Sequence, residues 1–362
     1  MAVEENQRDS MTSKVQKESA PIRMIQFGLG AAGCQLIRLA RSKGVELVGA
    51  IDADPAKHGK DAGELAGIGA IGVPVTTPDK LCHREVADVM FHATRYRPKE
   101  SADDAIPFLQ VGVNVIAISG ISYLPAYDQA LARRVDEAAR RGGATILGTG
   151  LNPGLLLDAI PILMSSACER IDLIHASRVA DFSPWGPETI NNYGMGLWPN
   201  EFEEQVASGK ISLHAEIAHS VGMIAHAMGG TMEDFRQERL SIVSKTRRTG
   251  KAVTIEPGQV CGFRHVATAR SSTGPAIKLE HCGVVHPDPA TDGVEPGTRV
   301  RIEGVPSVDV SLRGELSEST GVYAATAARA VNAVPYVIAA PPGLTSLADL
   351  PMMAWWGGGR RG

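Results

Sequence analysis

Residues 22–33 read IRMIQFGLGAAG, and this stretch decides the fold of the N-terminal part of the chain. An apolar run at 22–27 leads into Gly28-Leu29-Gly30-Ala31-Ala32-Gly33, a G-x-G-x-x-G sequence between a predicted strand and a predicted helix. In this motif the first glycine permits a tight turn, the second lets the backbone approach a pyrophosphate, and the third lets helix pack on strand. The sequence therefore predicts a dinucleotide-binding turn in which a helix N-terminus holds the phosphates. The alternative is a turn that serves packing alone.

Strands and helices alternate beyond this turn. Further strands are predicted at 46–51, 86–93, 114–118 and 145–148, and Leu131, Val135 and Ala138 share one face of a predicted helix between the last two. Strands that alternate with helices are joined by crossovers and pair in parallel. We therefore expect an α/β fold in which residues 21–150 form a Rossmann-type, doubly wound parallel sheet.

The pattern changes after Asn152. Strand-like runs follow one another with few helices between them, which is typical of an α+β region with a mixed or antiparallel sheet. An amphipathic segment at 213–228 lies among these runs, and a helical stripe begins at Tyr323. The expected strands lie at 171–180, 240–244, 260–269, 277–285, 298–303 and 307–313.

The composition of the chain indicates which classes of partner and which cellular compartment to expect. The chain has 36 Lys and Arg against 40 Asp and Glu, a formal net charge of −4 that predicts neither a nucleic acid nor a membrane as partner. Five cysteines lie far apart without a two-residue spacing, so we expect no zinc or redox motif and a reducing cytoplasm. The spacing of His214, His219 and His226 likewise predicts no metal site. Residues 1–20 lack the apolar run of a signal peptide, which indicates a disordered tail.

The second predicted strand ends at Asp52, which lies 24 residues after Gly28. An acidic side chain at this place can accept hydrogen bonds from the adenosine ribose hydroxyls. Asp52 and Asp54 together would repel a ribose 2′-phosphate, while Lys57 and Lys60 are near enough in sequence to soften that repulsion. We therefore expect an NAD(P)H cofactor, with NAD favoured over NADP.

Four segments carry a resemblance to a known group of enzymes. They are residues 22–33, GAIDADPAKHGKDAGEL at 49–65, GTGLNPGLLLD at 148–158 and TAARAVNAVPYVIAAPPGLTSLADLP at 326–351. The chain thus resembles the dihydrodipicolinate reductase-like NAD(P)-dependent dehydrogenases, in particular the 2,4-diaminopentanoate dehydrogenase and native amine dehydrogenase branch. The resemblance implies a homodimer or a higher oligomer, with a dinucleotide domain at 21–150 and a substrate and oligomerisation domain at 151–319. It also implies a C-terminal helix within 320–350 that returns to the first domain, which leaves a tail at 351–362.

The resemblance also places three strand ends at the nicotinamide. They are Ala93-Thr94, Ser119-Gly120 and Asn152-Pro153, as expected for ligands at the carboxyl ends of parallel strands. The amide of Asn152 is suited to hold the carboxamide of the nicotinamide. Ordinary strand-end hydrogen bonding is the alternative for Thr94 and Ser119.

Four residues are predicted at the substrate end. Arg178 and Asp181 match an Arg and an Asp of the resembling families, and an arginine can hold a substrate carboxylate through two hydrogen bonds. The alternative is an ion pair between these two residues. His281 matches a pocket histidine of the amine branch, although a lone histidine on a strand is more often structural. Asn192 belongs to a stretch with Trp185, Asn191 and Tyr193 that is too rich in Pro and Gly to be helical, and that we expect at the pocket rim.

The sequence departs from its relatives in two places. No His or Lys occurs in RVADFSPWGPETINNYGMG at 178–196, where dihydrodipicolinate reductases carry both, and Ser119-Gly120-Ile121-Ser122 stands where the amine branch carries a glutamate. Asp158 and Glu188 are candidates to replace that glutamate. The main hypothesis is an NAD(P)-dependent oxidoreductase acting on a small amine, imine or carbonyl compound. The alternatives are a dihydrodipicolinate reductase-type C=C or C=N reductase, a ketoreductase, or a non-catalytic dinucleotide-binding sensor.

Overall fold

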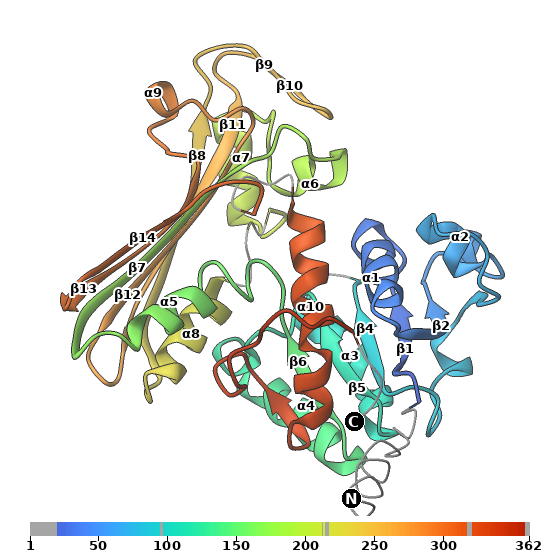
Figure 1. The fold of residues 1–362 in the computed structure, drawn as a ribbon. Helices are drawn as coiled ribbons and strands as arrows, with labels where there is room; N and C mark the ends of the chain where they lie inside the picture. Colours follow the sequence, from blue (N-terminus) through green and yellow to red (C-terminus); the bar gives the residue numbers. More distant parts are fainter. Residues whose placement is uncertain (1–19, 95–96, 212, 214–216, 317–320, 359–362) are drawn as a thin grey trace, which may run out of the picture.

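The structure is a computed structural model that describes residues 20–94, 97–211, 213, 217–316 and 321–358. Two large sheets lie in separate parts of the molecule, and a small two-stranded sheet projects from one of them (Figure 1). Most of the predicted N-terminal tail, residues 1–19, lies outside the described residues, and so do residues 359–362. None of the described helices combines the length and the apolar character that crossing a membrane requires.

The first sheet has seven strands in the order β15-β6-β5-β4-β1-β2-β3, and every pair in it is parallel. The chain leaves β1 toward β2 on one side and later returns to β4 on the other, which opens a crevice at the carboxyl end of β1. The predicted doubly wound sheet is confirmed. Its strands are β1 (Arg23–Phe27), β2 (Glu46–Ile51), β3 (Val75–Thr76), β4 (Val89–His92), β5 (Asn114–Ala117), β6 (Thr145–Gly148) and β15 (Gly343–Thr345).

Helices cover both faces of the first sheet. On one face α1 (Ala31–Ser42) and α10 (Val322–Ala339) pack against the strands, and on the other α3 (Pro98–Gln110) and α4 (Gln129–Gly142) do so. Buried apolar side chains from both faces form two cores around the sheet. The smaller elements are α2 (Ala62–Ala66) and the short 3-10 turns η1 (Pro55–Lys57), η2 (Pro78–Lys80) and η3 (Leu124–Ala126).

The second sheet has six strands in the order β14-β13-β7-β12-β11-β8. Its pairs are antiparallel except β7 with β12, so the predicted mixed sheet is confirmed. The strands are β7 (Arg170–Asp181), β8 (Met232–Val243), β11 (Val260–Ser271), β12 (Ala276–Val284), β13 (Gly297–Val305) and β14 (Val308–Leu312).

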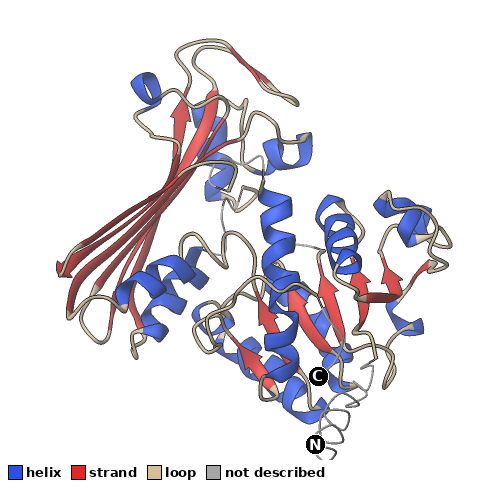
Figure 2. Ribbon diagram, in the orientation of Figure 1, coloured by secondary structure: helices blue, strands red, loops and turns tan. Residues whose placement is uncertain are grey.

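The two faces of the second sheet differ. The helices α5 (Ala159–Ser165) and α8 (Ile217–Ala227) pack on one face, which we call the closed face, and bury Ile174, Ala176 and Leu279. No described helix packs on the opposite face, which we call the open face (Figures 1 and 2). Because side chains alternate along a strand, His175 and Ser177 lie on the open face while Arg178 lies on the closed one.

The helix α10 connects the two parts of the molecule. It packs along α1 and continues through Pro335 to Ala339, within the range 320–350 in which a C-terminal helix was expected. Residues after β15 then lie against α10 and the end of α1. The Trp356 amide donates to Asn332 Oδ1 of α10 at 3.1 Å, and Nζ of Lys43, the C-cap of α1, lies 4.6 Å from the centre of the Trp355 ring. The described part of the predicted C-terminal tail therefore contacts the first domain, although Met352 and Trp355 are each 78% exposed.

The expectation that residues 185–193 are not helical is wrong. They contain α6 (Pro187–Asn192), and α7 (Pro199–Ala207) follows it. Both helices begin with proline, whose fixed backbone angle suits the first helical position and whose missing N–H is not needed there. The remaining elements are α9 (Pro289–Asp292), β9 (Arg248–Thr249) and β10 (Thr254–Ile255).

Candidate functional site

The glycines of the turn between β1 and α1 are required for different reasons. Gly28 has a φ of 92°, and a Cβ there would lie 2.3 Å from the Ala93 carbonyl oxygen. A Cβ at Gly33 would lie 1.8 Å from the Gly28 carbonyl oxygen, so helix and strand approach too closely for any side chain. Gly30 has an ordinary φ of −79°, and no described heavy atom lies within 4 Å of a Cβ built on it. The space at Gly30 fits the backbone approach that a pyrophosphate needs.

Two buried side chains hold this turn in place. Gln26, in β1, donates from Nε2 to the Gly28 carbonyl at 3.0 Å. The Leu29 amide donates to Asp52 Oδ2 at 2.7 Å, which ties the turn to the end of β2. The first amides of α1 follow directly, so their N–H groups and the helix dipole are available to an anion.

Asp52 is where the sequence predicts it, directly after β2. Lys57 Nζ donates to Asp52 Oδ2 at 2.8 Å, and the Asp54 amide donates to Oδ1 at 2.9 Å. Burial alone would raise the pKa of Asp52, but the Lys57 ammonium and the backbone amides of Asp54 and Leu29 hold that pKa below its ordinary value. The carboxylate is therefore ionised and ready to accept hydrogen bonds from hydroxyl groups.

The predicted strand-end residues lie at the same edge of the first sheet. Thr94 follows β4, and its Oγ1 lies 3.0 Å from Nε2 of the buried His92, which in turn lies 3.0 Å from Asp104 Oδ2. Thr94 therefore has a hydrogen-bond partner within its own strand end, which fits the alternative of ordinary strand-end hydrogen bonding. Ser119 is buried, and Gly120 has a φ of 80° with Ser101 Oγ 2.6 Å from the position of a Cβ.

Asn152 lies in the turn after β6, and the Asn152-Pro153 bond is cis. Both polar atoms of its side chain are buried and have no hydrogen-bond partner among the described residues. A buried amide without partners costs free energy, so a ligand that pairs with both atoms would be favoured there.

The carboxylate of Asp158 stabilises the turn after β6, and its hydrogen bonds indicate a structural rather than a catalytic role. Its carboxylate accepts from the Gly154 amide at 2.8 Å, the Ala159 amide at 2.7 Å and Ser220 Oγ at 2.9 Å. Burial raises its pKa, although these hydrogen bonds oppose the shift. Arg329 of α10 donates to the Gly154 carbonyl at 3.0 Å from the other side. These contacts fix the backbone beside Asn152.

Arg178 and His281 come together on the closed face of the second sheet. They are register partners in the parallel pair of β7 and β12, and their exposed fractions are 5% and 4%. The Nε and Nη2 atoms of Arg178 have no hydrogen-bond partner among the described residues. Burial lowers the pKa of Arg178 to about 10, so the guanidinium remains charged at neutral pH. A buried cation without a partner is costly and indicates a place for an anionic ligand.

Asp181 does not join them. It lies three residues further along β7 and therefore on the other face of the strand. Its carboxylate accepts from the Ser183 amide and hydroxyl, both at 2.8 Å, and from the His286 amide at 3.1 Å. These contacts close a local turn, and no hydrogen bond links Asp181 to Arg178 among the described residues. Asn192 is the exposed last residue of α6.

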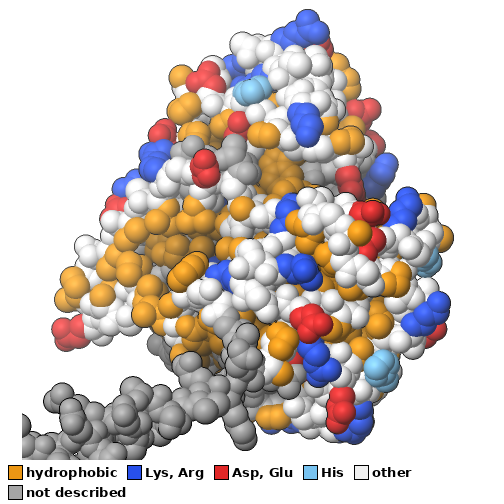
Figure 3. All heavy atoms as spheres, turned by 45° about the vertical axis from the view of Figure 1, so that its right-hand side comes forward, with side chains coloured by type: hydrophobic (Ala, Val, Ile, Leu, Met, Phe, Trp, Pro, Cys, Tyr) orange, Lys and Arg blue, Asp and Glu red, His pale blue; other side chains and the backbone are white. Residues whose placement is uncertain are grey.

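Aromatic rings surround the substrate end. Phe182 stacks on Trp185 with ring centres 5.6 Å apart, and Tyr193 stacks on Phe263 at 4.7 Å. Trp185 also contacts Tyr323 of α10 at 5.5 Å, so the N-terminus of α10 meets the second sheet's domain here. Hydrophobic side chains lie in the hollow between the two parts of the molecule (Figure 3).

Two residues near these rings bear on the sequence interpretation. The sequence predicts Tyr323 only as the start of a helical stripe, because the path of α10 to the second sheet's domain does not follow from a single sequence. Glu188, a candidate for the missing glutamate, is exposed in the first turn of α6. It is near enough to Tyr323 to add to the rise that burial causes in the pKa of that phenol.

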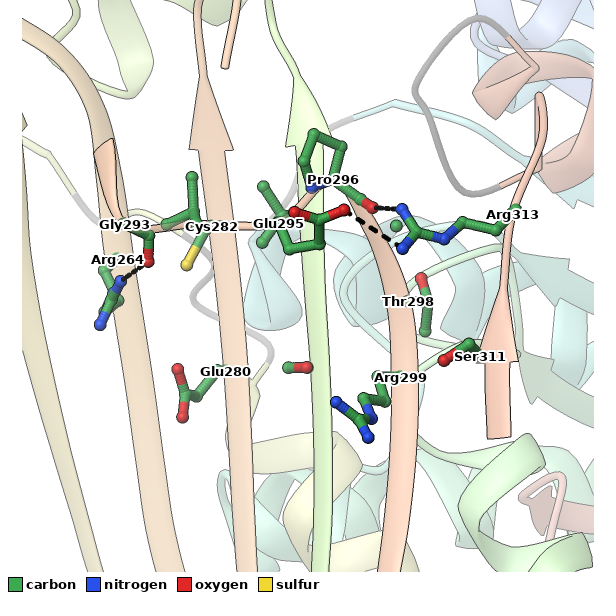
Figure 4. A pocket seen from close by; sticks show the side chains of 14 residues that line it. Arg264, Glu280, Cys282, Gly293, Glu295, Pro296, Thr298, Arg299, Ser311 and Arg313 are labelled. Carbon is green, nitrogen blue, oxygen red and sulfur yellow. Dashed lines mark hydrogen bonds and ion pairs between the residues drawn. The ribbon is translucent and has the colours of Figure 1, made fainter. Parts of the chain in front are cut away.

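A different pocket, of about 310 Å³, lies on the open face (Figure 4). Its charged side chains already have partners: Arg264 donates to the Gly293 carbonyl at 3.2 Å, and Arg313 pairs with Glu295 at 3.3 Å. Ser177 and Val179 line it, so it lies on the side of β7 opposite to Arg178. We therefore place the candidate site on the closed face. The described residues contain no group of three or more His, Cys, Asp or Glu arranged to bind a metal ion.

Comparisons with known proteins identify the family of the chain. The family model for the 2,4-diaminopentanoate dehydrogenase C-terminal domain matches residues 155–361, and that for the dihydrodipicolinate reductase N-terminus matches residues 22–120. The chain is 30% identical to a 2,4-diaminopentanoate dehydrogenase of Acetoanaerobium sticklandii over 342 residues, 91% of this chain and 94% of the relative. It is 27% identical to an amine dehydrogenase of Streptomyces virginiae over 91% of this chain and 96% of that one.

A solved structure extends the comparison. The amine dehydrogenase from Mycobacterium smegmatis has a TM-score of 0.80 at 25% identity, covering 93% of this chain and 98% of that chain. The resemblance indicated by the sequence is thereby confirmed along both domains.

Proposed function

Since this chain belongs to the 2,4-diaminopentanoate dehydrogenase family, we propose that it is an NAD(P)-dependent dehydrogenase acting on a small substrate with an amino, imino or carbonyl group. The observation that carries the proposal is the open space at Gly30, where neither packing nor φ requires a glycine. The unpartnered amide of Asn152 adds a polar group at the same sheet edge. Both features fit a dinucleotide.

Each part of the site has a role in this proposal. The amides of the Gly28–Gly33 turn and α1 bind the phosphates, Asp52 accepts from the ribose hydroxyls, and Asn152 holds the carboxamide. The nicotinamide supplies or accepts the hydride when it is bound. The protein's contribution is orientation: the substrate carbon must face the nicotinamide while the aromatic rings around Trp185 exclude water.

Arg178 supports a carboxylate-bearing substrate. Its guanidinium fork matches the two oxygens of a carboxylate, and His281 lies beside it as a further polar contact. Because the same positive charge repels an ammonium group, the substrate's nitrogen would point away from Arg178, toward the first sheet. We therefore propose a small amino or oxo acid, held by its carboxylate at the second sheet.

The missing glutamate favours a second candidate. Ser119-Gly120 offers no carboxylate to an amine or imine, and Asp158 is committed to the turn after β6. Reduction of a carbonyl needs a hydrogen-bond donor rather than a carboxylate, so a ketoreductase remains the second proposed activity.

We also propose the coenzyme, the assembly and the compartment. Asp52 supports NAD over NADP because its ionised carboxylate can accept a hydrogen bond from a ribose hydroxyl, which a 2′-phosphate does not offer. The open face of the second sheet supports a homodimer, since a broad sheet face without a covering helix can be buried against a second copy. The five cysteines form no disulfide among the described residues, which fits a reducing cytoplasm.

The decisive experiment follows the absorbance of the reduced nicotinamide with purified protein. A small oxo acid would be offered with and without ammonia, beside the neutral ketone of the same length. Oxidation that requires ammonia supports the dehydrogenase acting on amines, and oxidation without ammonia supports the ketoreductase. Binding of NADH without turnover across the whole panel would instead support a non-catalytic sensor.

A further inference from the structure

We propose that His219 of α8 is a positioning residue whose neutral imidazole joins the second sheet's domain to the turns expected at the nicotinamide, so that protonation of this imidazole weakens coenzyme binding in acid. The inference rests on the proposed function in that the turns after β5 and β6 must contact a bound dinucleotide. It goes beyond that function because it assigns a role to a helix that lies outside the coenzyme and substrate positions described above.

The helix α8 has two contacting sides. One side packs on the closed face of the second sheet through apolar residues, which are Ile217, Val221, Ile224 and Ala225. His219, Gly222 and His226 lie three and four residues apart and therefore share the opposite side. This opposite side faces the first domain, where a Cβ at Gly222 would lie 2.4 Å from Ala126 Cβ of η3. The helix α8 is thus in close contact with both domains (Figure 1).

Two buried side chains of α8 fix the two turns expected at the nicotinamide. The Tyr123 amide donates to His219 Nδ1 at 3.0 Å, and Tyr123 lies three residues after Gly120, in the segment that follows β5. Ser220 Oγ donates to Asp158 Oδ2 at 2.9 Å, and Asp158 stabilises the turn after β6. Because His219 and Ser220 are 0% and 1% exposed, water does not compete for these hydrogen bonds. One helix of the second domain therefore holds both turns.

The hydrogen bond from Tyr123 requires a neutral His219. A backbone amide can only donate, so Nδ1 must carry a lone pair and the ring hydrogen must lie on Nε2. A protonated imidazole has N–H donors at both nitrogens. Protonation would therefore set two donors against each other and leave a buried amide without its acceptor, which is costly in free energy. Acid thus breaks the contact between α8 and the segment after β5.

His226 is the second histidine on this side of α8, and acid acts on it in the opposite sense. Its Nε2 lies 2.9 Å from Asp349 Oδ1, so protonation of His226 strengthens this pair. Both partners are nearly half exposed, so the pair contributes little. A loss of coenzyme affinity in acid is therefore expected from His219 and not from His226. The other titratable groups around α8 are Tyr123 and Tyr127 of the first domain, Asp158 with Arg329 beside it, and His265 and His281 of the closed face.

The inference predicts a pH dependence that one substitution removes. In the wild type, the dissociation constant of the coenzyme should rise roughly 10-fold between about pH 8 and about pH 5.5, the range in which histidines gain a proton. This change corresponds to about 1.4 kcal/mol, the size of one hydrogen bond. In His219→Asn the side-chain oxygen takes the place of Nδ1 and cannot be protonated, so the affinity should stay high at both pH values. In His219→Leu the affinity should be low at both.

The test is a calorimetric titration of the full chain with NAD⁺ and with NADP⁺ at both pH values, without substrate. The 2′-phosphate of NADP⁺ itself gains a proton in this range, so each coenzyme is compared between wild type and His219→Asn. His226→Asn is the matched control, because it removes the other histidine from the same side of α8 and should keep the pH dependence of the wild type. Thermal melts show that the compared chains are folded. If His219→Leu does not fold, the comparison of wild type with His219→Asn still decides.

The outcomes are distinguishable. A rise of the dissociation constant in acid in the wild type and in His226→Asn, but not in His219→Asn, supports the inference. A wild-type affinity that does not change with pH, an equal loss in His219→Asn, or tight binding by His219→Leu overturns it and leaves the proposed function standing. A wild-type chain that binds neither coenzyme at about pH 8 overturns the proposed function as well.

Discussion

Gly30 and Gly33 lie three residues apart in one turn and are glycines for different reasons. Protein atoms fill the place of a side chain at Gly33, whereas the place at Gly30 is open. Packing therefore explains the third glycine of the motif but not the second. A comparison of variants at the two positions separates stability from coenzyme binding.

Gly30→Val is expected to fold and to lose coenzyme binding. The change costs about 1 kcal/mol of stability or less, because Gly30 is the N-cap of α1 and Val is only a poorer N-cap residue. Affinity for NADH should fall roughly 100-fold or more, since the side chain takes the space of the pyrophosphate. Gly33→Val is the contrasting variant and should lose about 3 kcal/mol or more by overpacking. Thermal melts and fluorescence titrations measure both, and unchanged NADH affinity in Gly30→Val would refute the assignment of the turn.

Arg178→Lys tests the substrate end. Lysine keeps the charge but lacks the planar guanidinium group that can form two parallel hydrogen bonds. The value of kcat/KM for an oxo acid should therefore fall, which corresponds to a loss of roughly 1–3 kcal/mol of transition-state stabilisation. The value for the neutral ketone should change little. Asp181→Asn is the matched control, because its contacts to Ser183 and His286 predict lower thermal stability without a change in substrate preference. Equal losses for both substrates in Arg178→Lys would remove Arg178 from the site.

At the scale of elements, one carboxylate links the strands that pair in parallel in the second sheet. Glu280 of β12 lies 3.1 Å from His175 Nε2 on β7 and 2.6 Å from Lys278 Nζ. The hydrogen bond from His175 is the main cause that lowers the pKa of Glu280 to about 2, with Lys278 adding to it against the opposing effect of burial. A carboxyl group whose pKa is lower in the folded than in the unfolded state stabilises the fold at pH values above its unfolded-state pKa. This contribution is lost as the pH falls through the folded-state pKa.

Glu280→Gln should therefore destabilise the protein at neutral pH and change little in strong acid. We expect a loss of about 1 kcal/mol at pH 7, allowing for partial exposure of the partners. The difference from wild type should shrink as the pH falls from about 4.5 to about 2. Urea unfolding across this range measures it. Glu303→Gln is the control, because Glu303 is exposed on β13, which β7 separates from β12. A constant difference at every pH would show that the ion pairs are not its source.

Some of the strands could be predicted from the sequence and others could not. β1 and β2 were predicted nearly to the residue because each is an apolar run that ends at a glycine or an acid. Two-residue β3 and three-residue β15 are too short to show a period. The first half of β8 was missed because its sequence, MEDFRQER, is charged and partly exposed.

Only some positions of the candidate site could be predicted from the sequence. The glycine turn, Asp52 and Asn152 each follow a strand that the sequence predicts, so their place at one edge of the first sheet could be predicted as well. Asp181 was grouped with Arg178, although the alternation of a strand places residues three apart on opposite faces. The contact of Tyr323 with Trp185 needed the path of α10, which one sequence does not contain.

At the scale of the whole molecule, the two sheets are unlike in their surroundings. Helices cover both faces of the first sheet, while the second sheet leaves its open face without a described helix. Leu240 lies on that face as the register partner of Arg264, and 49% of it is exposed. If the open face is the surface that a second copy buries, as proposed above, the Leu240 side chain lies within that interface.

Leu240→Arg should shift the protein toward monomers. The side chain is already half exposed, so the stability of a single chain should change by no more than about 0.5 kcal/mol. Burying a new cation between two copies would be costly. Leu163→Arg is the control, since Leu163 is 48% exposed on α5, away from the open face. Light scattering at several concentrations reads the mass, and a dimer that survives Leu240→Arg would place the interface elsewhere.

The edge strand β15 has a consequence for the order in which the protein matures on the ribosome. It pairs with β6 through Gly343 and Thr145, and α10 covers α1 with residues that are also made late. The nascent N-terminal domain therefore emerges first but lacks its outer strand and one covering helix until translation is almost complete. The edge of the first sheet at β6 is unpaired while the second domain is synthesised. A ribosome that stalls before residue 343 releases a chain whose first sheet lacks the edge strand β15.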